Sequence, residues 1–543
     1  MTSLSTARTI PQLLAERAQL DAHPALVDGS RVVSYRELSE LSHHAARAYL
    51  ADGVTRGDRI AIWAENRIEF ALALLGAQLI GASVVPLNTR FTGREAAELL
   101  ERSGARVLVV SDGFLGKSYA GMLRDALADQ AAAGSGPVPA LPTLRTIVHL
   151  DDATGTDDHE WAGYLARGAA VSEDALSAAT AQVSPDDIAD LLFTSGTTGA
   201  PKGVPSTQRQ TISVAYAWAL GAELSPSDRY AVVNPMFHGF GYKAGLITCI
   251  VAGATVYPLA TLDTTGLLDL IERERISVLP GVPTVFTSLL DHPEVATRDT
   301  SSLRFATAGA ATAPETLFQD MKSVLGFDRV AQAYGLSECV VATMTRKEDD
   351  IDHVKQTSGP AVAGIEIKVV NADGVAVATG EDGEILLRGA DVMRGYYDDP
   401  EATAAAIDPD GWLHTGDIGQ LDEHGCLKIT DRLKDMYIVG GFNVYPAEIE
   451  NVLRKHPAVN ESAVIGIDDA RLGNVGRAYV VLRHDAPADI TPESLHDFCR
   501  THLANFKVPR EFVFVSDFPR TGAGKILKGE LRDRARQETA ARA

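Results

Sequence analysis

The chain has 543 residues, a formal net charge of −22, 45% hydrophobic and 22% charged residues, and four cysteines. This composition is typical of a globular protein and excludes a disordered or fibrous chain. At roughly 100–200 residues per domain, the length predicts two or three structural units. The acidic balance, with no strong basic patch, disfavours binding to nucleic acid or to an anionic membrane. The cysteines are far apart and lack metal-ligand spacing, so we expect neither disulfides nor a zinc site, and a reducing cytoplasm as the compartment.

Apolar helical patterns alternate with short β-branched runs in the first part of the chain. Helices are predicted over 35–51, 69–80 and 93–103, and strands over 58–63, 83–87 and 106–110. This alternation indicates an α/β fold with parallel sheets. Around 131–140 the sequence becomes rich in small residues, glycine and proline, which predicts an exposed loop.

The texture of the sequence changes near residue 430. A charged segment at 431–435 is followed by a Gly-Gly turn and a helix entered at Pro446. Strands are then predicted over 462–467, 478–483 and 511–515, with a helix over 492–504. The pattern predicts a compact α+β unit behind the large α/β body.

Two uncharged stretches, 70–89 and 244–262, need comparison with a membrane helix. A spanning helix requires about 20 apolar residues. Glycine and proline interrupt both stretches; the second predicts a helix to about Val251 and a strand over 255–258. We therefore expect a helix followed by a parallel strand in each, and no membrane insertion. The N-terminus shows no basic region followed by an apolar one, so no secretory signal is expected.

The segment 188–203 carries the most informative pattern. A strand over 188–194 enters a run of hydroxyl and glycine positions, which ends at Pro201, Lys202 and Gly203. Glycines let backbone N–H groups face an anion, hydroxyls add donors and the ammonium adds charge, so the segment predicts phosphate binding. It is not a Walker A loop, because proline precedes the lysine and glycine follows it. A flexible surface loop is the alternative that composition alone allows.

This loop resembles the phosphate loop of the adenylate-forming superfamily, which comprises acyl-CoA synthetases, peptide-synthetase adenylation domains and beetle luciferases. The family's other motifs follow in the family's order, at 234–243, 308–311, 333–338, 414–417, 431–435, 440–446 and 520–525. One such match would be weak, whereas the ordered series spans nearly the whole chain. The resemblance implies a large, multi-subdomain N-terminal adenylation domain over 1–430, a hinge at 431–435 and a small mobile C-terminal lid over 436–543.

The resemblance also implies the chemistry: a carboxylate attacks the α-phosphate of ATP and pyrophosphate leaves. Catalysis of such a step is mainly positioning and charge neutralisation. ATP or AMP is expected to contact Thr194, Ser195, Gly196, Thr197, Thr198, Gly199, Lys202, Tyr334, Gly335, Ser337, Asp417, Arg432 and Lys525. In the family's pattern Tyr334 would stack on adenine, while Asp417 would accept the ribose hydroxyls and Arg432 would donate to the same sugar.

The expected catalytic residues are Lys525, Glu338, His238 and Thr194. Glu338 resembles the family's Mg²⁺ ligand, and a carboxylate suits this hard ion. Lys525 lies beside glycine-bearing turns and is implied to bridge the substrate carboxylate and the phosphate. Ser337 stands where most relatives have threonine, so the hydroxyl is kept. An isolated charged residue is usually a solvated surface group, and only the motif context favours function here.

The acyl pocket is expected at His238, Gly309, Ala310 and Ala311. The family's histidine orients the substrate carboxylate; a buried histidine bonded to backbone is the structural alternative. Small residues at 309–311 would let the acyl group pass, although tight packing would also explain them.

Two further features are implied for the second half-reaction, in which the lid rotates and coenzyme A attacks. Gly440 and Gly441 would line the pantetheine channel, because glycines permit close backbone approach. Lys434 would be the hinge that absorbs the backbone change. Only 543 − 525 = 18 residues follow Lys525, so we expect free coenzyme A as the acceptor rather than a fused carrier domain.

Within the acyl-CoA synthetases, the sequence most resembles actinobacterial ligases that act on the propanoate side chain of steroid-ring degradation products. It departs from them at Gln208, where a histidine is expected, and over 339–344, both expected near the acyl pocket. Fatty or aromatic acids therefore stay open as substrates. The alternatives for function are transfer of the activated acid to a carrier protein or another nucleophile, and a non-catalytic nucleotide sensor, which would be free to lose Lys525 or Glu338. A homodimer is a family expectation.

Overall fold

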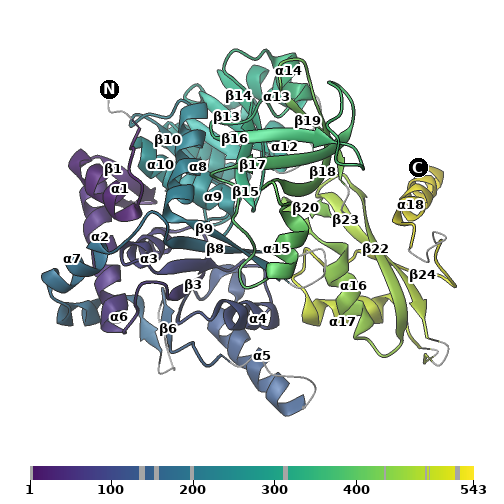
Figure 1. The fold of residues 1–543 in the computed structure, drawn as a ribbon, viewed down its shortest axis with the longest axis horizontal. Coiled ribbons are helices and arrows are strands. Elements are labelled where there is room, and N and C mark those ends of the chain that lie inside the picture. The colour runs from purple at the N-terminus through teal and green to yellow at the C-terminus, as the bar shows by residue number, and fades with distance from the viewer. Residues whose placement is uncertain are drawn as a thin grey trace. The chain divides into compact units, whose positions relative to one another are not determined.

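The structure is a computed structural model (Figure 1) that describes residues 4–133, 141–151, 158–195, 201–309, 316–432, 436–483, 486–487, 489–519 and 526–542. The chain forms two compact units. The first comprises residues 1–89, 97–193 and 203–430, and the second comprises 90–96, 194–202 and 431–543. The first unit has parallel sheets with many helices, and the second is a small α+β assembly. The predicted fold class is confirmed.

One sheet of seven strands begins the first unit. Its order is β7 (His159–Glu160), β6 (Thr146–His149), β5 (Val107–Val110), β3 (Arg59–Trp63), β4 (Ser83–Pro86), β8 (Ile188–Ser195) and β9 (Pro201–Thr207). The helices α2 (Tyr35–Ala51), α3 (Ile68–Leu79) and α4 (Gly93–Ser103) alternate with its strands. All of α3 except Glu69 is buried, which explains why its sequence is apolar on every side. The elements predicted between residues 35 and 110 are confirmed to within one or two residues.

A second sheet of eight strands has the order β15 (Cys339–Met344), β14 (Arg329–Leu336), β13 (Phe305–Gly309), β12 (Val278–Gly281), β10 (Arg229–Val232), β11 (Thr255–Pro258), β1 (Pro24–Asp28) and β2 (Arg31–Ser34). Its central strands are parallel, whereas β15 and β2 pair antiparallel at the two edges. The carboxyl ends of β13 and β14 therefore lie at one edge, where ligands of α/β proteins bind.

The helix predicted to end near Val251 differs from the expectation in its first turns. Residues Tyr242–Ile247 form a π-helix (η4), and α10 (Thr248–Ala252) continues it. A π-helix holds more residues per turn than an α-helix and is often found at functional sites. Here both Tyr242 and Lys243 turn into the protein interior, which an apolar pattern alone does not reveal.

The last sheet of the first unit is antiparallel, with the order β16 (Ile365–Val370), β17 (Gly383–Gly389), β18 (Leu413–Leu421) and β19 (Leu427–Arg432). The other helices of this unit are α1 (Ile10–Arg17), α5 (Tyr119–Ala133), α6 (Trp161–Arg167), α7 (Glu173–Ala181), α8 (Gln208–Gly221), α9 (Gly239–Gly241), α11 (Thr264–Glu274), α12 (Pro283–Leu290), α13 (Leu317–Ser323), α14 (Ile351–Gln356) and α15 (Pro400–Ala406). The loop predicted over 131–140 is wrong at its start, because α5 continues to Ala133 on alanines with high helix propensity; residues 134–140 lie outside the described chain.

The second unit contains a sheet with the order β21 (Phe442–Val444), β20 (Tyr437–Val439), β23 (Gly473–Leu482) and β22 (Val459–Asp469), and β24 (Glu511–Phe514) pairs with β23. Its helices are α16 (Pro446–Arg454), α17 (Pro492–His502) and α18 (Lys528–Arg542). Strands β22 and β23 are longer than predicted, because their ladder continues through Asp468 opposite Asn474, a polar pair that a hydrophobic pattern does not mark.

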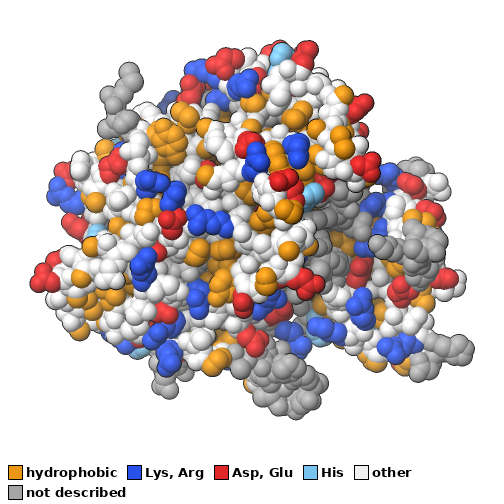
Figure 2. All heavy atoms as spheres, viewed as in Figure 1, with side chains coloured by type: hydrophobic (Ala, Val, Ile, Leu, Met, Phe, Trp, Pro, Cys, Tyr) orange, Lys and Arg blue, Asp and Glu red, His pale blue; other side chains and the backbone are white. Residues whose placement is uncertain are grey.

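Three sequence expectations can be compared with these described parts. None of the helices in the described ranges has both the length and the apolar character needed to cross a bilayer. All four cysteines are buried free thiols. On the face shown in Figure 2, Lys and Arg side chains are interspersed with Asp and Glu side chains.

Candidate active site

The hairpin of β14 and β15 carries four of the predicted nucleotide-binding and metal-binding residues. Leu336 pairs with Cys339, so Ser337 and Glu338 form its two-residue turn. Gly335 precedes the turn at a point where a Cβ atom would lie 2.1 Å from the carbonyl oxygen of Val340. Any side chain there would push the two strands apart, which explains the glycine of this motif.

Tyr334, on β14, is bonded to Asp417, on β18. The Tyr334 hydroxyl donates to Asp417 Oδ2 at 2.6 Å, and only 9% of Tyr334 is exposed. Glu384 fixes the backbone directly before Asp417, because its carboxylate accepts the backbone N–H of Gly416 at 3.2 Å. The structure thus brings together the residue predicted to face adenine and the residue predicted to hold the ribose.

Glu338 is oriented by a residue that the sequence analysis missed. The Tyr396 hydroxyl donates to Glu338 Oε1 at 2.7 Å, and the backbone N–H of Met393 donates to the Glu338 carbonyl at 2.8 Å. Since a carboxylate has two oxygens, a bond to Oε1 leaves the group able to present Oε2 to a hard cation. The pair of tyrosines at 396–397 was the available signal, but tyrosines in a loop are usually explained by packing.

His238 is the N-cap of the short helix α9. Its Nδ1 accepts the backbone N–H of Phe240 at 3.3 Å. A neutral imidazole that accepts at Nδ1 carries its proton on Nε2, which makes Nε2 a donor. The ring is solvent-accessible, yet enough protein surrounds it that desolvation lowers the pKa of His238 from its ordinary value of 6.5. At neutral pH the ring is therefore an uncharged donor.

An apolar cluster lies beside the His238 segment. It contains Val214, Trp218, Ala244, Val341 and Met344, with Phe240, Ala333, Val340 and Val362 packed against it. The rings of Trp218 and Phe240 meet edge to face at 5.5 Å. At the neighbouring Gly239, a Cβ atom would lie 3.2 Å from the side chain of Val340, a tight contact that Val340 would have to relieve by a small shift. Gly309 ends β13 at the carboxyl edge of the same sheet as Ala333, which is its register partner on β14.

The amide of Gln208, one of the two departures from the relatives, is hydrogen-bonded inside the protein. Its Oε1 accepts the backbone N–H of Ile10 at 2.8 Å, and its Nε2 donates to the Gln78 carbonyl at 3.1 Å. Gln208 is completely buried. Both ends of the amide thus join α1 and α3 to α8, and the expectation that this position lies near the acyl group stays a prediction. The departure over 339–344 remains relevant, since Val340, Val341 and Met344 belong to the apolar cluster.

The predicted phosphate loop is only partly visible. Thr194, near the end of β8, donates to the carbonyl oxygen of Lys202, in β9, over a long 3.5 Å. Several predicted residues lie outside the described chain: Gly196, Thr197, Thr198, Gly199, Ala310, Ala311, Lys434 and Lys525. The backbone of Ser195 and Arg432 is described as strand, but their side chains are not.

In the second unit, Gly440 and Gly441 form the turn between β20 and β21. Val439 pairs with Phe442, and the two glycines have φ of +55° and +87°. Positive φ at both central positions is the condition for a tight hairpin turn, which accounts for both glycines without any ligand. A role in a pantetheine channel remains a prediction.

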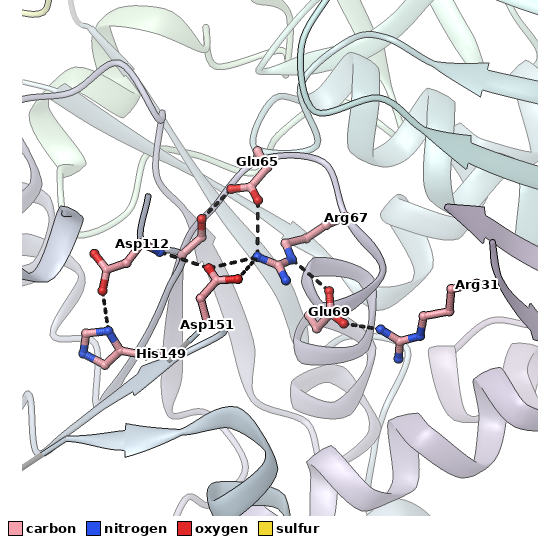
Figure 3. A network of polar contacts seen from close by, with 8 residues as sticks. Arg31, Glu65, Arg67, Glu69, Asp112, His149 and Asp151 are labelled. Atoms are coloured by element: carbon pink, nitrogen blue, oxygen red, sulfur yellow. Dashed lines mark hydrogen bonds and ion pairs between the residues drawn. The ribbon is translucent and has the colours of Figure 1, made fainter. Parts of the chain in front are cut away.

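A polar network in the first unit is a second group that the sequence analysis did not identify (Figure 3). Arg67 Nε binds Glu69 at 2.8 Å, and its Nη1 binds Asp151 at 2.9 Å and Glu65 at 3.3 Å. These residues follow or flank β3 and β6. On the other side of the network, His149 Nδ1 forms a hydrogen bond with Asp112 Oδ2 at 2.5 Å. The Arg67 guanidinium is surrounded by carboxylates from several elements. We therefore interpret the network as one that stabilises the carboxyl edge of the seven-stranded sheet.

Comparisons with known proteins agree with this geometry. The family model described as AMP-binding enzyme matches residues 14–397, and the model described as AMP-binding enzyme C-terminal domain matches residues 448–525. A 3-(7a-methyl-1,5-dioxo-octahydro-1H-inden-4-yl)propanoyl:CoA ligase of Mycobacterium tuberculosis is 48% identical over 97% of this chain and 99% of its own length.

Two further similarities cover almost the whole chain. A ligase of the same name from Rhodococcus jostii is 45% identical over 94% of this chain and 95% of its own. Among solved structures, a double mutant of o-succinylbenzoate CoA synthetase from Bacillus subtilis, bound to a product analogue, has a TM-score of 0.79 at 29% identity, covering 96% of this chain and 98% of that one.

Proposed function

This chain belongs to the AMP-binding enzymes of the adenylate-forming superfamily, and we propose that the acid it activates is a propanoate attached to a compact bicyclic ring system. The chain is an ATP-dependent acid–CoA ligase of the AMP-forming class. It converts a carboxylic acid to an acyl-adenylate with release of pyrophosphate and then transfers the acyl group to coenzyme A. Transfer to a carrier protein or to another nucleophile is not favoured by these relatives.

The observation that carries the substrate proposal is the similarity, over nearly the whole chain and at 48% and 45% identity, to two ligases whose names specify a methyl-dioxo-octahydroindenyl propanoate. The apolar cluster around Trp218, Phe240 and Val340 supports it. Aromatic and branched side chains offer flat, rigid surfaces that suit a fused ring better than a flexible chain, because a ring loses less conformational entropy on binding.

For the nucleotide, Tyr334 and Asp417 form one prearranged unit through their 2.6 Å hydrogen bond. We assign the adenine face to Tyr334, the ribose to Asp417 and Arg432, and the phosphates to 194–199, Lys202 and Ser337. Lys525 completes the set by neutralising the charges of the attacking carboxylate and the α-phosphate. Holding these groups in place in advance reduces the reorganisation that the transition state requires.

Mg²⁺ is the metal that this class of ligase uses, and the residues present fit it. Glu338 is a hard oxygen ligand whose orientation is fixed by Tyr396. When bound, the ion neutralises charge on phosphate oxygens. His238, as a neutral Nε2–H donor, would orient the substrate carboxylate from the apolar cluster's side.

The domain roles are part of the proposal. Residues 1–430 would be the adenylation domain, 431–435 the hinge containing Lys434, and 436–543 a mobile lid that brings Gly440 and Gly441 to the pantetheine in the second half-reaction. A break between compact units at residues 430 and 431 supports this division.

We also propose a reducing cytoplasm as the compartment, which four unpaired thiols support. For the oligomeric state we propose a homodimer, which light scattering would test.

The test is pyrophosphate release over a panel of acids, measured with and without coenzyme A, with the thioester identified by mass spectrometry. The panel contains the bicyclic propanoate, a long-chain fatty acid, an aromatic acid and o-succinylbenzoate. We expect the highest kcat/KM for the bicyclic propanoate, by at least 100-fold over the fatty acid. A fatty or aromatic acid that outperforms it would overturn the substrate proposal, and release without any thioester would overturn the acceptor.

A further inference from the structure

A buried ion pair lies in the first unit among the elements that carry the site. Lys243 Nζ, with a side chain 1% exposed, lies 3.0 Å from Asp190 Oδ1, whose side chain is 0% exposed. The ammonium also donates to Ser206 Oγ at 2.6 Å. Asp190 Oδ2 accepts the Thr211 hydroxyl at 2.7 Å. Both charges are therefore held entirely by protein groups.

Four elements meet at this pair. Lys243 belongs to the π-helix η4 and follows His238 by five residues. Asp190 lies in β8, Ser206 in β9 and Thr211 in α8. In the sequence, β8 and β9 flank the predicted phosphate loop. One side chain thus connects the segment that carries His238 to both strands beside that loop.

A second polar layer reinforces the same connection. The Gln78 amide donates to the Tyr242 hydroxyl at 2.6 Å and to the Ala189 carbonyl at 3.0 Å. Consecutive residues of η4 are therefore tied to consecutive residues of β8, Tyr242 through Gln78 to Ala189 and Lys243 directly to Asp190. Both side chains are buried, as are the other four residues of the π-helix.

The charge of Lys243 also influences Asp391, which lies two residues before a hydrogen-bond partner of Glu338. Asp391 accepts the Ser213 hydroxyl at 2.8 Å. Burial raises the pKa of Asp391, while the Ser213 hydrogen bond and the Lys243 charge lower it. Two residues later, Met393 donates its backbone N–H to the Glu338 carbonyl at 2.8 Å.

Stability does not explain such a pair. Removing two charges from water costs several kcal/mol per ion, and apolar residues of the same volume are often as stabilising or more so. A buried pair does fix which groups lie opposite each other, because a shifted arrangement would leave a charge uncompensated. We propose that Lys243 is a positioning residue for adenylation, which holds the His238 segment in register with strands β8 and β9 so that the acid and the α-phosphate are presented to each other.

This inference rests on the proposed function, and its test uses the full chain with the acid that the panel identifies. The key variant is the neutral double substitution Lys243→Met with Asp190→Asn, which removes both charges and keeps an acceptor for Thr211. We expect its Tm to lie near that of the wild type, whereas Lys243→Met alone lowers the Tm by leaving Asp190 uncompensated. We expect kcat for acid-dependent pyrophosphate release to fall at least tenfold in the double variant, with KM for ATP changed less than threefold.

The two half-reactions separate positioning from general damage. With pre-made acyl-adenylate and coenzyme A, the double variant should form thioester within threefold of the wild-type rate, because the α-phosphate is already joined to the acid. A double variant with wild-type Tm and wild-type adenylation would overturn the inference. Equal losses in both half-reactions would also overturn it, because a structural role alone predicts that result.

A matched control and a milder variant complete the design. Arg304 and Asp228 form an ion pair at 2.6 Å in the same unit, at the amino end of β10, in which Asp228 is buried and Arg304 is 30% exposed; their neutral double substitution Arg304→Met with Asp228→Asn should leave adenylation within threefold. Should the Lys243 double variant fail to fold, Ser206→Ala removes only one hydrogen bond from the ammonium. We expect a three- to tenfold lower adenylation kcat at unchanged Tm, and an unchanged kcat would overturn the inference. A wild-type enzyme inactive with the bicyclic acid would instead refute the proposed substrate.

Discussion

Lys243 in the first unit and Arg477 in the second are both buried cations, but their carboxylates lie in different surroundings. Asp190 is fully buried beside Lys243, whereas the partners of Arg477, Glu511 and Glu538, are 40% and 33% exposed. Arg477 is itself only 3% exposed and joins β23 to β24 and α18.

This difference distinguishes two uses of a buried charge. Glu511 and Glu538 keep part of their hydration, so the Arg477 cluster joins secondary structure at a modest desolvation cost. Lys243 and Asp190 are both removed from water. The desolvation free energy of such a pair exceeds the free energy that apolar residues of the same volume would require. We therefore expect the Lys243–Asp190 pair to affect rate constants, and the Arg477 cluster to affect stability. Lys525, also in the second unit, is the expected exception, because its motif places it in the chemistry.

The largest effect is expected for Lys525→Ala. Loss of the ammonium should reduce pyrophosphate exchange at least 10³-fold, because no other cation would neutralise the attacking carboxylate and the phosphate together. Thioester formation from pre-made acyl-adenylate should fall less than tenfold. Rapid-quench measurements of the two half-reactions provide the comparison, and a parallel loss of both would show that Lys525 does not act on adenylation specifically.

Arg477→Met should act on stability rather than on rate. The substitution removes the Arg477 cation from Glu511 and Glu538, and Glu538 keeps its ion pair with Arg534. We therefore expect the free energy of unfolding of the second unit to fall by about 1–2 kcal/mol. Calorimetry or denaturant titration measures this change. At a temperature where the variant is folded, adenylation should stay within threefold of the wild type. A tenfold loss of kcat in folded protein would remove the distinction between the two units.

Tyr396→Phe tests whether the first unit fixes its metal ligand in advance. Without the hydroxyl, Glu338 can rotate, and we expect the Mg²⁺ concentration for half-maximal adenylation to rise three- to tenfold with an unchanged Tm. Tyr397→Phe is the matched control, because Tyr397 follows Tyr396 directly and has no hydrogen bond to Glu338 among the described contacts. An equal effect of both substitutions would point to packing instead.

The smallest effect concerns pH. Because desolvation by the surrounding protein lowers the pKa of His238 below 6.5, the ring is neutral at pH 7 and gains its proton only as the pH falls through that lowered value. We expect adenylation to be nearly constant between pH 6.5 and 8 and to decline at more acidic pH. In His238→Asn, which keeps an N–H donor but cannot titrate, the acidic decline should shift or disappear. An unchanged profile would assign the decline to another group.

The fold class and the order of the motifs could be predicted from the sequence, because periodicity and glycine-bearing motifs are local signals. The connections between motifs could not. Nothing near Tyr334 in the sequence indicates a bond to Asp417, and Tyr396 looks like a packing residue until Glu338 is seen beside it. In the sequence Lys243 is only the last residue of the 234–243 motif, since burial of its charge depends on Asp190, 53 positions earlier.

Two further features could not be predicted from the sequence, for the same reason. Nothing near Gln208 in the sequence indicates that its amide binds the backbone of Ile10 and Gln78. The apolar pattern predicts an ordinary helix where Tyr242–Ile247 form a π-helical turn, because the pattern reports hydrophobicity and not the hydrogen bonds of its polar members. In both cases the partners come from distant parts of the chain.

The β14–β15 hairpin has a consequence for anyone who wishes to change the acid that the enzyme accepts. Its two-residue turn presents Glu338, and two residues later the same strand contributes Val340 to the apolar cluster. The backbone of Val340 is close to Gly335, so we expect a bulky substitution at 340 to displace the proposed metal ligand as well as the wall of the proposed acyl pocket. Substrate scope and metal affinity would then change together. Val214 and Trp218, on helix α8, reach the same cluster from a separate element and offer a way to redesign specificity without this coupling.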